Sequence, residues 1–353
     1  MEKDQIELSF LSIFTLLTFF IFFLISKYSY KFQNGILMDQ DFSKPQAFHQ
    51  MAISRSGGLA GIISLNIFFI IYFLIYSKII FEYLFLCNLM FFIGFLDDVR
   101  TKISPLKRLA LMIFFLFILI HFIPIKISNI DVPYLSILIN NNLFSSIFVL
   151  LCLLFIINGA NLIDGFNGLL AINLIIINSI LTYINIDTGN IEFSVFIIGQ
   201  LIIMLSFLLF NFPNSKIFFG DSGSYLMGGL VALNAIITNN LNPNYSSFFF
   251  CILLFYLFFE VFFSFVRKVI QKKSPVHPDN KHLHMLLFDR VSLKYGKNKG
   301  NYINSIIINL IYFICIFPAL YFAKNPVVSR YWFFLLILIY LFTYYRLYRL
   351  TKN

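Results

Sequence analysis

Mostly apolar stretches, each long enough to cross a bilayer as a helix, recur along the whole 353-residue chain. The mean hydropathy is +0.85, and a spanning helix needs about 20 mostly apolar residues. Backbone groups in lipid must bond to one another, so a spanning chain forms either helices or a closed barrel. Continuous apolar runs such as 62–75 and 306–317 lack the alternation of barrel strands. We therefore predict an all-α, polytopic integral membrane protein.

The apolar stretches predict about eleven transmembrane helices in a single membrane-embedded domain over residues 1–353. The first stretch is preceded by acidic residues and lacks a small-residue cleavage site, so we interpret it as a retained span. The four cysteines are isolated in apolar stretches, and we expect them to be buried small hydrophobes. The predicted spans are 8–26, 58–76, 79–96, 107–124, 143–158, 168–186, 193–210, 223–239, 247–266, 304–323 and 331–349.

Lysine and arginine predict the orientation of these spans. One side of the membrane receives 21 of the 26 basic residues, and the other side receives 5. Because basic residues are retained in the cytoplasm, we expect the N-terminus outside and the C-terminus in the cytoplasm. Most of the net charge of +10 then comes from basic residues that set the orientation in the membrane. Some of them also attract anionic headgroups of the bilayer. We do not expect nucleic-acid binding. The predicted cytoplasmic loops are 27–57, 97–106, 159–167, 211–222 and 267–303.

Acidic residues gather at span ends on the predicted cytoplasmic side. Asp97 and Asp98 follow the third span, and adjacent carboxylates stay ionised only where a cation or a basic neighbour offsets their charge. Carboxylate oxygens suit Mg²⁺, which takes waters and substrate phosphates as its other ligands. The pair predicts a divalent-metal or phosphate site, with a solvated loop cap as the alternative. Basic residues follow at Arg100, Lys102, Lys107 and Arg108.

Amides and a carboxylate recur three residues apart after the fifth span. In a helix or tight turn this spacing aligns them on one side, and the nearby glycines allow a ligand to approach the backbone closely. Such donors and acceptors suit the edge of a nucleobase or sugar. Helix capping is the alternative. The residues are Asn158, Asn161, Asp164 and Asn167, with Gly165 and Gly168 among them.

Two further motifs lie on the same predicted face. The glycine-rich segment 219–224 opens the eighth span, where free backbone N–H groups make an anion site. Asp221 within it would either cap the helix or carry a metal to a bound phosphate. His282 and His284 lie in the longest basic loop without zinc-like spacing. We expect them to donate to a pyrophosphate or sugar, and a solvated loop is the alternative.

Glu260 is the main carboxylate within the predicted spans, and it forms an i, i+4 pair with Ser264. We interpret Glu260 as a structural anchor for the histidine loop. His121 is interpreted as a packed or interfacial histidine. The tyrosines of the last span predict an interfacial belt; they are Tyr340, Tyr344, Tyr345 and Tyr348.

Taken in order, these motifs resemble the polyprenyl-phosphate N-acetylhexosamine-1-phosphate transferase family. That family includes enzymes that start O-antigen, common-antigen and teichoic-acid synthesis, and the phospho-N-acetylmuramoyl-pentapeptide transferase. The resemblance also covers a first-loop segment with His49 and Arg55. Five modest motifs in one order, each at the expected membrane face, are together specific.

The resemblance implies transfer of a sugar 1-phosphate from a UDP-N-acetylhexosamine to undecaprenyl phosphate, with release of UMP, in a bacterial cytoplasmic membrane. The implied cofactor is Mg²⁺, with Mn²⁺ as a substitute. Asp221 resembles the main metal ligand. Asp97 resembles the carboxylate that engages the lipid phosphate, as a base in one step or as a nucleophile in two, and Asp98 resembles its essential neighbour.

The remaining implied positions concern the donor. Asn161 and Asp164 resemble nucleoside-binding positions, with Asn158 and Asn167 nearby, and Phe218 is placed to stack on uracil. His282 and His284 match a histidine motif for the sugar-phosphate part, and His49 and Arg55 belong to the substrate-binding loop. A phosphate monoester is largely deprotonated at neutral pH, which mildly favours direct displacement. A homodimer is kept as an assembly to test.

The chain departs from the family pattern at three places. Met285 stands where relatives have a further histidine, residues 52–54 replace the usual Pro-Thr-Pro, and Asn167 replaces an aspartate of some relatives. We therefore favour an O-antigen or common-antigen type branch, with UDP-N-acetylglucosamine ahead of a deoxy sugar. Two other hypotheses stay open: a transporter or carrier of lipid-linked sugars, which would require polar residues at mid-membrane, and an inactive scaffold.

Overall fold

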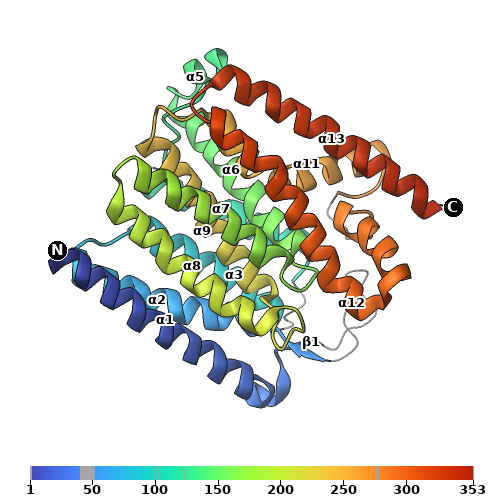
Figure 1. The fold of residues 1–353 in the computed structure, drawn as a ribbon, viewed down its shortest axis with the longest axis horizontal. Helices are drawn as coiled ribbons and strands as arrows, with labels where there is room; N and C mark the ends of the chain where they lie inside the picture. The colour runs from blue at the N-terminus through green and yellow to red at the C-terminus, as the bar shows by residue number, and fades with distance from the viewer. Residues whose placement is uncertain are drawn as a thin grey trace.

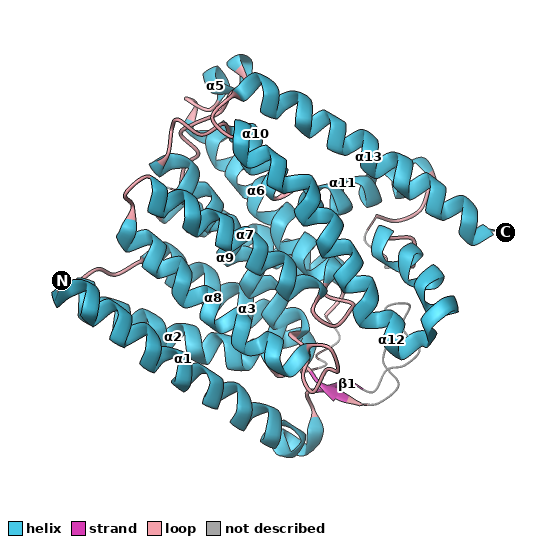
Figure 2. Ribbon diagram, in the orientation of Figure 1, coloured by secondary structure: helices cyan, strands magenta, loops and turns pink. Residues whose placement is uncertain are grey.

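The computed structural model describes residues 2–39, 52–99, 101, 103–123, 125–275, 277 and 279–352. Long helices run side by side through the molecule, with the short helix α5 at one end and strand β1 at the other (Figure 1). Helices account for nearly all of the regular structure (Figure 2). The all-α prediction is confirmed.

The elements follow each other with short connections. The helices are α1 Glu2–Tyr28, α2 Gly57–Tyr76, α3 Phe81–Asp98, α4 Pro105–Phe122, α5 Pro133–Leu138, α6 Asn142–Ile163, α7 Leu169–Asp187, α8 Ile191–Asn211, α9 Gly220–Leu241, α10 Ser247–Leu253, α11 Phe255–Ile270, α12 Leu283–Ile316 and α13 Pro326–Lys352. The 3₁₀ helices are η1 Ser29–Gly35 and η2 Phe317–Phe322, and the strands are β1 Met38–Asp39 and β2 Ile53–Ser54.

Every predicted span coincides with helical structure, but not every one is apolar enough to cross a membrane alone. Among the described residues, eight helices pass on length and composition, or nine when the bent pair α10–α11 counts as one span. The estimate of eleven is therefore too high by this criterion. Helix α3 has three acidic residues in its 18, and α9 is rich in Asn, Ser and Gly. Most of α9 is buried among other helices. Its side chains therefore contact protein, whereas the side chains of an outer helix contact lipid.

The structure differs from the sequence prediction in two segments. The span 247–266 bends by 76° between α10 and α11. The region 267–303 is not one long loop, because α12 begins at Leu283 and runs through a non-helical break at Gly296 into the tenth predicted span. The first turns of α12 bury His284, Met285, Leu286 and Phe288 against the protein. That apolar face stabilises a helix, although the composition of the segment is basic and polar.

Glycines let the central helices approach one another. A Cβ on Gly94 of α3 would lie 2.4 Å from the carbonyl carbon of Asp221, and one on Gly159 of α6 would lie 2.3 Å from the carbonyl oxygen of Leu257. Neither position tolerates a larger side chain without displacement of a backbone. This packing brings the end of α3 against the start of α9.

Candidate active site

A short backbone ladder organises the start of the site. Strands β1 and β2 pair antiparallel, and Ser54 of β2 also bridges to Ile217. The Phe218 N–H donates to the Ser54 carbonyl (2.8 Å), and the Phe218 carbonyl accepts from the Gly57 N–H (2.8 Å). The backbone ladder therefore joins the start of α2 to the segment that enters α9.

Asp98 binds the first turn of α9. Its Oδ1 accepts from the Asp221 N–H (3.0 Å), and its Oδ2 accepts from the Ser222 N–H (2.9 Å) and hydroxyl (2.6 Å). These donors are among the groups that a helix start leaves without intrahelical partners, and a carboxylate there also interacts well with the helix dipole. Asp98 therefore fixes the position of α9 relative to α3.

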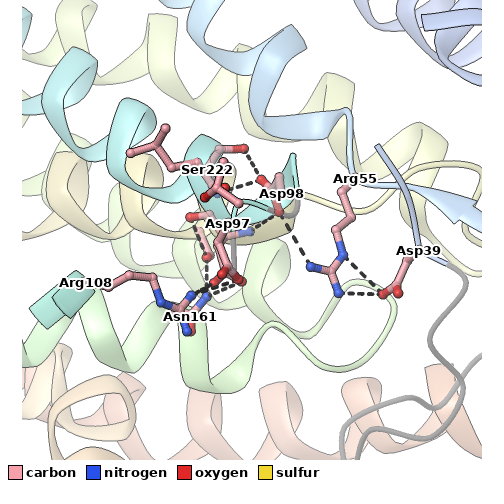
Figure 3. Close-up of polar contacts among 11 residues, drawn as sticks. Asp39, Arg55, Asp97, Asp98, Arg108, Asn161 and Ser222 are labelled. Atoms are coloured by element: carbon pink, nitrogen blue, oxygen red, sulfur yellow. Dashed lines mark hydrogen bonds and ion pairs between the residues drawn. The ribbon is translucent and has the colours of Figure 1, made fainter. Parts of the chain in front are cut away.

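Asp97 and Asp221 face a shared arginine. The Arg108 Nη1 lies 3.0 Å from Asp97 Oδ2 and also donates to Asp221 Oδ2. The Asn161 amide donates to the other oxygen of Asp221 at 3.1 Å and to Ser224 Oγ at 3.0 Å. Figure 3 shows Arg108 and Asn161 converging on this acidic group while Asp98 points toward Ser222. One positive charge therefore lies between two carboxylates.

Burial perturbs both carboxyl groups that follow the predicted third span. Burial first, and then the nearby Asp221, raise the pKa of Asp97 to about 6, against the lowering effect of Arg108. Burial and Asp221 also raise the pKa of Asp98 to about 7, and the hydrogen bonds from Ser222 oppose that shift. Both groups therefore gain from a cation at this position.

Arg55 closes the other side of the acidic group. Its Nε and Nη2 donate to one oxygen of Asp39 at 3.2 and 2.7 Å, and its Nη1 lies 3.7 Å from Asp98 Oδ1. Arg55 thus links β1 to the end of α3 (Figure 3). His49, which we predicted in the same loop, lies outside the described residues.

The amide segment does not act as one aligned row. Asn161 reaches Asp221, whereas the Asn158 amide donates to the Leu154 carbonyl of its own helix (2.8 Å). Asn167 connects its loop to two other segments. Its side-chain amide donates to the Pro213 carbonyl and its backbone N–H donates to Asn301 Oδ1, both at 2.8 Å. Helix α6 ends at Ile163, which turns the later positions away from its face. The expectation of one shared side was wrong for Asn167, which lies beyond the end of α6.

Asp164 and Phe218 are at the edge of this group. Asp164 is the C-terminal cap position of α6, and burial, reinforced by Asp221 and Asp98, raises the pKa of its carboxyl well above the usual range. Phe218 is half-buried, next to Phe219, whose ring stacks on Phe207 with 3.5 Å between centroids. The uracil-stacking role of Phe218 stays a prediction.

The histidines belong to a second polar group. His282 and His284 are both buried, and the two rings lie parallel with centroids 5.5 Å apart. Glu260 Oε1 lies 3.1 Å from His282 Nδ1 and accepts from the Leu283 N–H at 3.1 Å. Glu260 therefore has the anchoring contacts that we expected, while Ser264 instead accepts from Arg267. The Phe166 ring, 5.8 Å from that of His284, connects this group to the loop after α6.

Comparison with known proteins shows a similarity to one family over part of the chain. Residues 80–239, which contain both halves of the acidic group, match the model of glycosyl transferase family 4. The chain is similar to this family over that segment. It is 33% identical over 143 residues to an undecaprenyl-phosphate alpha-N-acetylglucosaminyl 1-phosphate transferase of Thermotoga maritima, covering 40% of this chain and 42% of that protein.

Two other relatives have a different name. The chain is 32% identical over 154 residues to a phospho-N-acetylmuramoyl-pentapeptide-transferase of Clostridium perfringens, covering 41% of this chain and 49% of that protein. It is 28% identical over 199 residues to the protein of that name from Clostridioides difficile, covering 53% and 62%. The chain thus spans about half the length of the curated relatives it matches.

The donor set of the acidic group fits Mg²⁺. Among the described residues, no group of three or more His, Cys, Asp or Glu side chains is arranged to hold a metal. The guanidinium of Arg108 nevertheless shows that a cation is favourable between Asp97 and Asp221. Two carboxylates suit Mg²⁺, because that ion takes waters and phosphates as its other ligands. Asp98 is less suited, since both its oxygens already accept hydrogen bonds.

Sequence reasoning treated Arg108 only as one of several basic neighbours. Its contact with Asp221 joins residues far apart in the chain, and no local pattern marks it. Its position three residues after Pro105 at the start of α4 aims it back at the end of α3. Asp39, Ser222 and Tyr340 were missed as polar partners for the same reason.

Proposed function

We propose that this protein transfers an N-acetylhexosamine 1-phosphate from a UDP-sugar to undecaprenyl phosphate and releases UMP. The observation that carries the proposal is the pairing of Asp97 with Asp221 around one cation, Arg108, at the ends of α3 and α9. The family match and the names of the relatives support the same reaction class.

The reaction joins two anions. An oxygen of the lipid phosphate attacks the phosphorus next to the sugar, a new P–O bond forms, and the bond to the bridging oxygen breaks so that UMP leaves. Positive charge must offset the repulsion between the phosphates. Mg²⁺, when bound, would supply most of this charge. We propose that Asp221 and Asp97 are its protein ligands. We propose that Arg108 offsets the negative charge of the phosphoryl group that is transferred.

The other residues hold the substrates and the frame. We assign Asp97 to engagement of the lipid phosphate and Asp98 to fixing the first turn of α9. We assign Asn161, Asp164 and Phe218 to the nucleoside, and the histidine segment to the phosphates of the donor. Arg55 and the loop around His49 border the site from the side of β1.

Membrane placement supports an amphiphilic acceptor. Two helices long and apolar enough to span a bilayer, α4 and α6, carry Arg108 and Asn161 of the site. An apolar polyprenyl chain must enter such a site sideways from lipid. The excess of basic residues on the side of the site supports a cytoplasmic face, an outside N-terminus and a cytoplasmic C-terminus. We further propose an O-antigen-like pathway in a bacterial inner membrane, with N-acetylglucosamine as the first sugar to test.

The test is UMP release from purified protein with Mg²⁺, undecaprenyl phosphate and a panel of UDP-N-acetylhexosamines. We expect one donor to give UMP and a lipid-linked sugar in equal amounts. Asp97→Asn and Asp221→Asn should abolish both products while the proteins still insert. If no donor of the panel gives UMP, the proposed transferase activity is wrong. Sugar flux across sealed vesicles without UMP release would favour a carrier instead.

A further inference from the structure

An apolar cavity lies between α11, α12 and α13, away from the acidic group. Its volume is 180 Å³, and its walls are almost entirely hydrocarbon. Three tyrosines line it, Tyr256, Tyr312 and Tyr340, and each of their hydroxyls already forms a hydrogen bond within the protein. Thr343 contributes one more hydroxyl. A buried water needs two to four polar partners, so the cavity suits a hydrocarbon occupant better than water.

The cavity opens toward the lipid-facing side of the helix bundle. Ile311 of α12 and Ile339 of α13 both line it, and they are 50% and 40% exposed. Both helices are long and apolar enough to span a bilayer, and α13 runs along the outside of the bundle beside α12 (Figure 1). Exposed isoleucines on such helices face the hydrocarbon core of the membrane. The opening between α12 and α13 therefore admits a lipid chain.

The length of the cavity matches one leaflet of a bilayer. On α13 its lining extends from Leu336 to Leu347, eleven residues apart and so about 16 Å at the usual helical rise. One leaflet contributes about 15 Å of hydrocarbon, half of the core thickness. Leu283, which directly follows His282, lines the end on the side of the candidate active site. The occupant is therefore a chain from the leaflet on that side.

Two basic side chains flank this end of the cavity. Lys281 Nζ lies 5.5 Å from the centre of the Tyr348 ring, and the Lys281 carbonyl accepts from the Tyr344 hydroxyl of α13 at 3.1 Å. Arg346 is exposed and lies seven residues, or about two turns, after Ile339, so it is on the same side of α13 as the opening. Basic residues at the membrane surface attract anionic headgroups.

We propose that this cavity binds an acyl chain of an anionic phospholipid, whose headgroup phosphate lies between Lys281 and Arg346. This lipid is distinct from the polyprenyl acceptor of the proposed reaction. Tyr340 connects it to the site, because its ring lines the cavity and its hydroxyl donates to Glu260 Oε2 at 2.6 Å. Since Glu260 also holds the histidine segment, the bound chain supports the wall behind that segment. Tyr340 and Tyr344 are buried, which contradicts the interfacial belt that the sequence predicted for them.

The experiment titrates the purified full chain in detergent with phosphatidylglycerol or phosphatidylcholine of identical acyl chains. The unfolding temperature and the lipid retained in native mass spectrometry are measured. We expect both lipids to raise the unfolding temperature, with phosphatidylglycerol acting at a concentration on the order of tenfold lower. Equal action of the two lipids would overturn the headgroup site. A rise caused by undecaprenyl phosphate and by neither phospholipid would assign the cavity to the acceptor and overturn the proposal.

Variants that fill the cavity test the position of the chain. Cys315→Phe adds bulk from α12 and Thr343→Phe adds bulk from α13, and both residues line the cavity. We expect each variant to bind either lipid on the order of tenfold more weakly, because the chain buries fewer methylene groups. Ile314→Phe, at an exposed position outside the lining, is the matched control and should bind lipid as the natural chain does. Unchanged lipid binding by the filling variants would overturn the chain site.

A double variant tests the headgroup. Lys281→Gln combined with Arg346→Gln should bind phosphatidylglycerol no better than phosphatidylcholine, while binding of phosphatidylcholine stays unchanged. Arg349→Gln is the matched control, since Arg349 lies nine residues after Tyr340 and therefore on the opposite side of α13. A preference for phosphatidylglycerol that persists in the double variant would overturn the assignment of the headgroup to Lys281 and Arg346.

Discussion

The carboxylate of Asp98 and the first turn of α9 at Ser222 form one structural unit. Three donors from residues 221 and 222 converge on the two oxygens of Asp98. Asp97, the adjacent residue, instead points to Arg108. Two neighbouring carboxylates therefore have different partners, and we expect different consequences when each is changed.

Asp98→Asn should lower both stability and activity. An amide presents one oxygen and one NH₂ group, so it faces at least one N–H or O–H donor with another donor. The expected cost is about 1–3 kcal/mol for a buried group left unsatisfied. Thermal unfolding in detergent measures it. Asp97→Asn is the matched control, and we expect it to lose UMP release with a nearly unchanged unfolding temperature. Equal unfolding temperatures for both variants would contradict the different roles of Asp97 and Asp98.

Gly220→Ala should destabilise the start of α9. Gly220 has a φ of +71°, and a Cβ there would lie 2.5 Å from Asp98 Oδ2. The substitution adds a steric clash to the ordinary cost of a positive φ, which is about 1 kcal/mol. Gly189→Ala isolates the second cost, because Gly189 has a φ of +81° with nothing within 4 Å. The difference in unfolding temperature between the two variants reports the clash, and no difference would refute it.

Arg108→Gln should make the protein depend more strongly on metal. Without the guanidinium, Asp97 and Asp221 repel each other in a partly buried setting, so the metal-free protein loses stability and Mg²⁺ or Mn²⁺ restores it. Unfolding temperatures with and without Mg²⁺, and Mn²⁺ binding followed by electron paramagnetic resonance, measure this. Lys107→Gln removes an exposed neighbouring charge and should behave as the natural chain. A metal response of Arg108→Gln equal to that control would remove Arg108 from the site.

Much of this architecture follows from patterns within single segments. Apolar length predicts where the helices lie, and the basic-residue count groups the polar span ends on one side. Asp97, Asp98 and Asp221 were therefore predicted to meet, and they do. Their separate partners were not predictable, because each contact joins segments that only packing brings together.

The amide segment shows the limit of spacing arguments. A three-residue repeat aligns side chains only while the helix continues, and α6 ends at Ile163. Asn161 lies before that end and reaches Asp221, whereas Asn167 lies after it and holds the chain near Pro213. Conversely, the helix from Leu283 was hidden by its basic composition, although its first turns have a buried apolar face.

Arg55 and Asp39 should be energetically coupled. The guanidinium gives Asp39 two hydrogen bonds, and the two side chains are 19% and 13% exposed, so solvent screens the pair only partly. Arg55→Gln removes these two hydrogen bonds from Asp39 and a cation near Asp98. We expect Arg55→Gln and Asp39→Asn each to lower stability, and the double variant to lose less than the sum, with a coupling of about 1–3 kcal/mol. Unfolding of the natural chain, both single variants and the double variant completes the cycle. Strict additivity would show that Arg55 serves Asp98 or a substrate phosphate and that β1 does not depend on it.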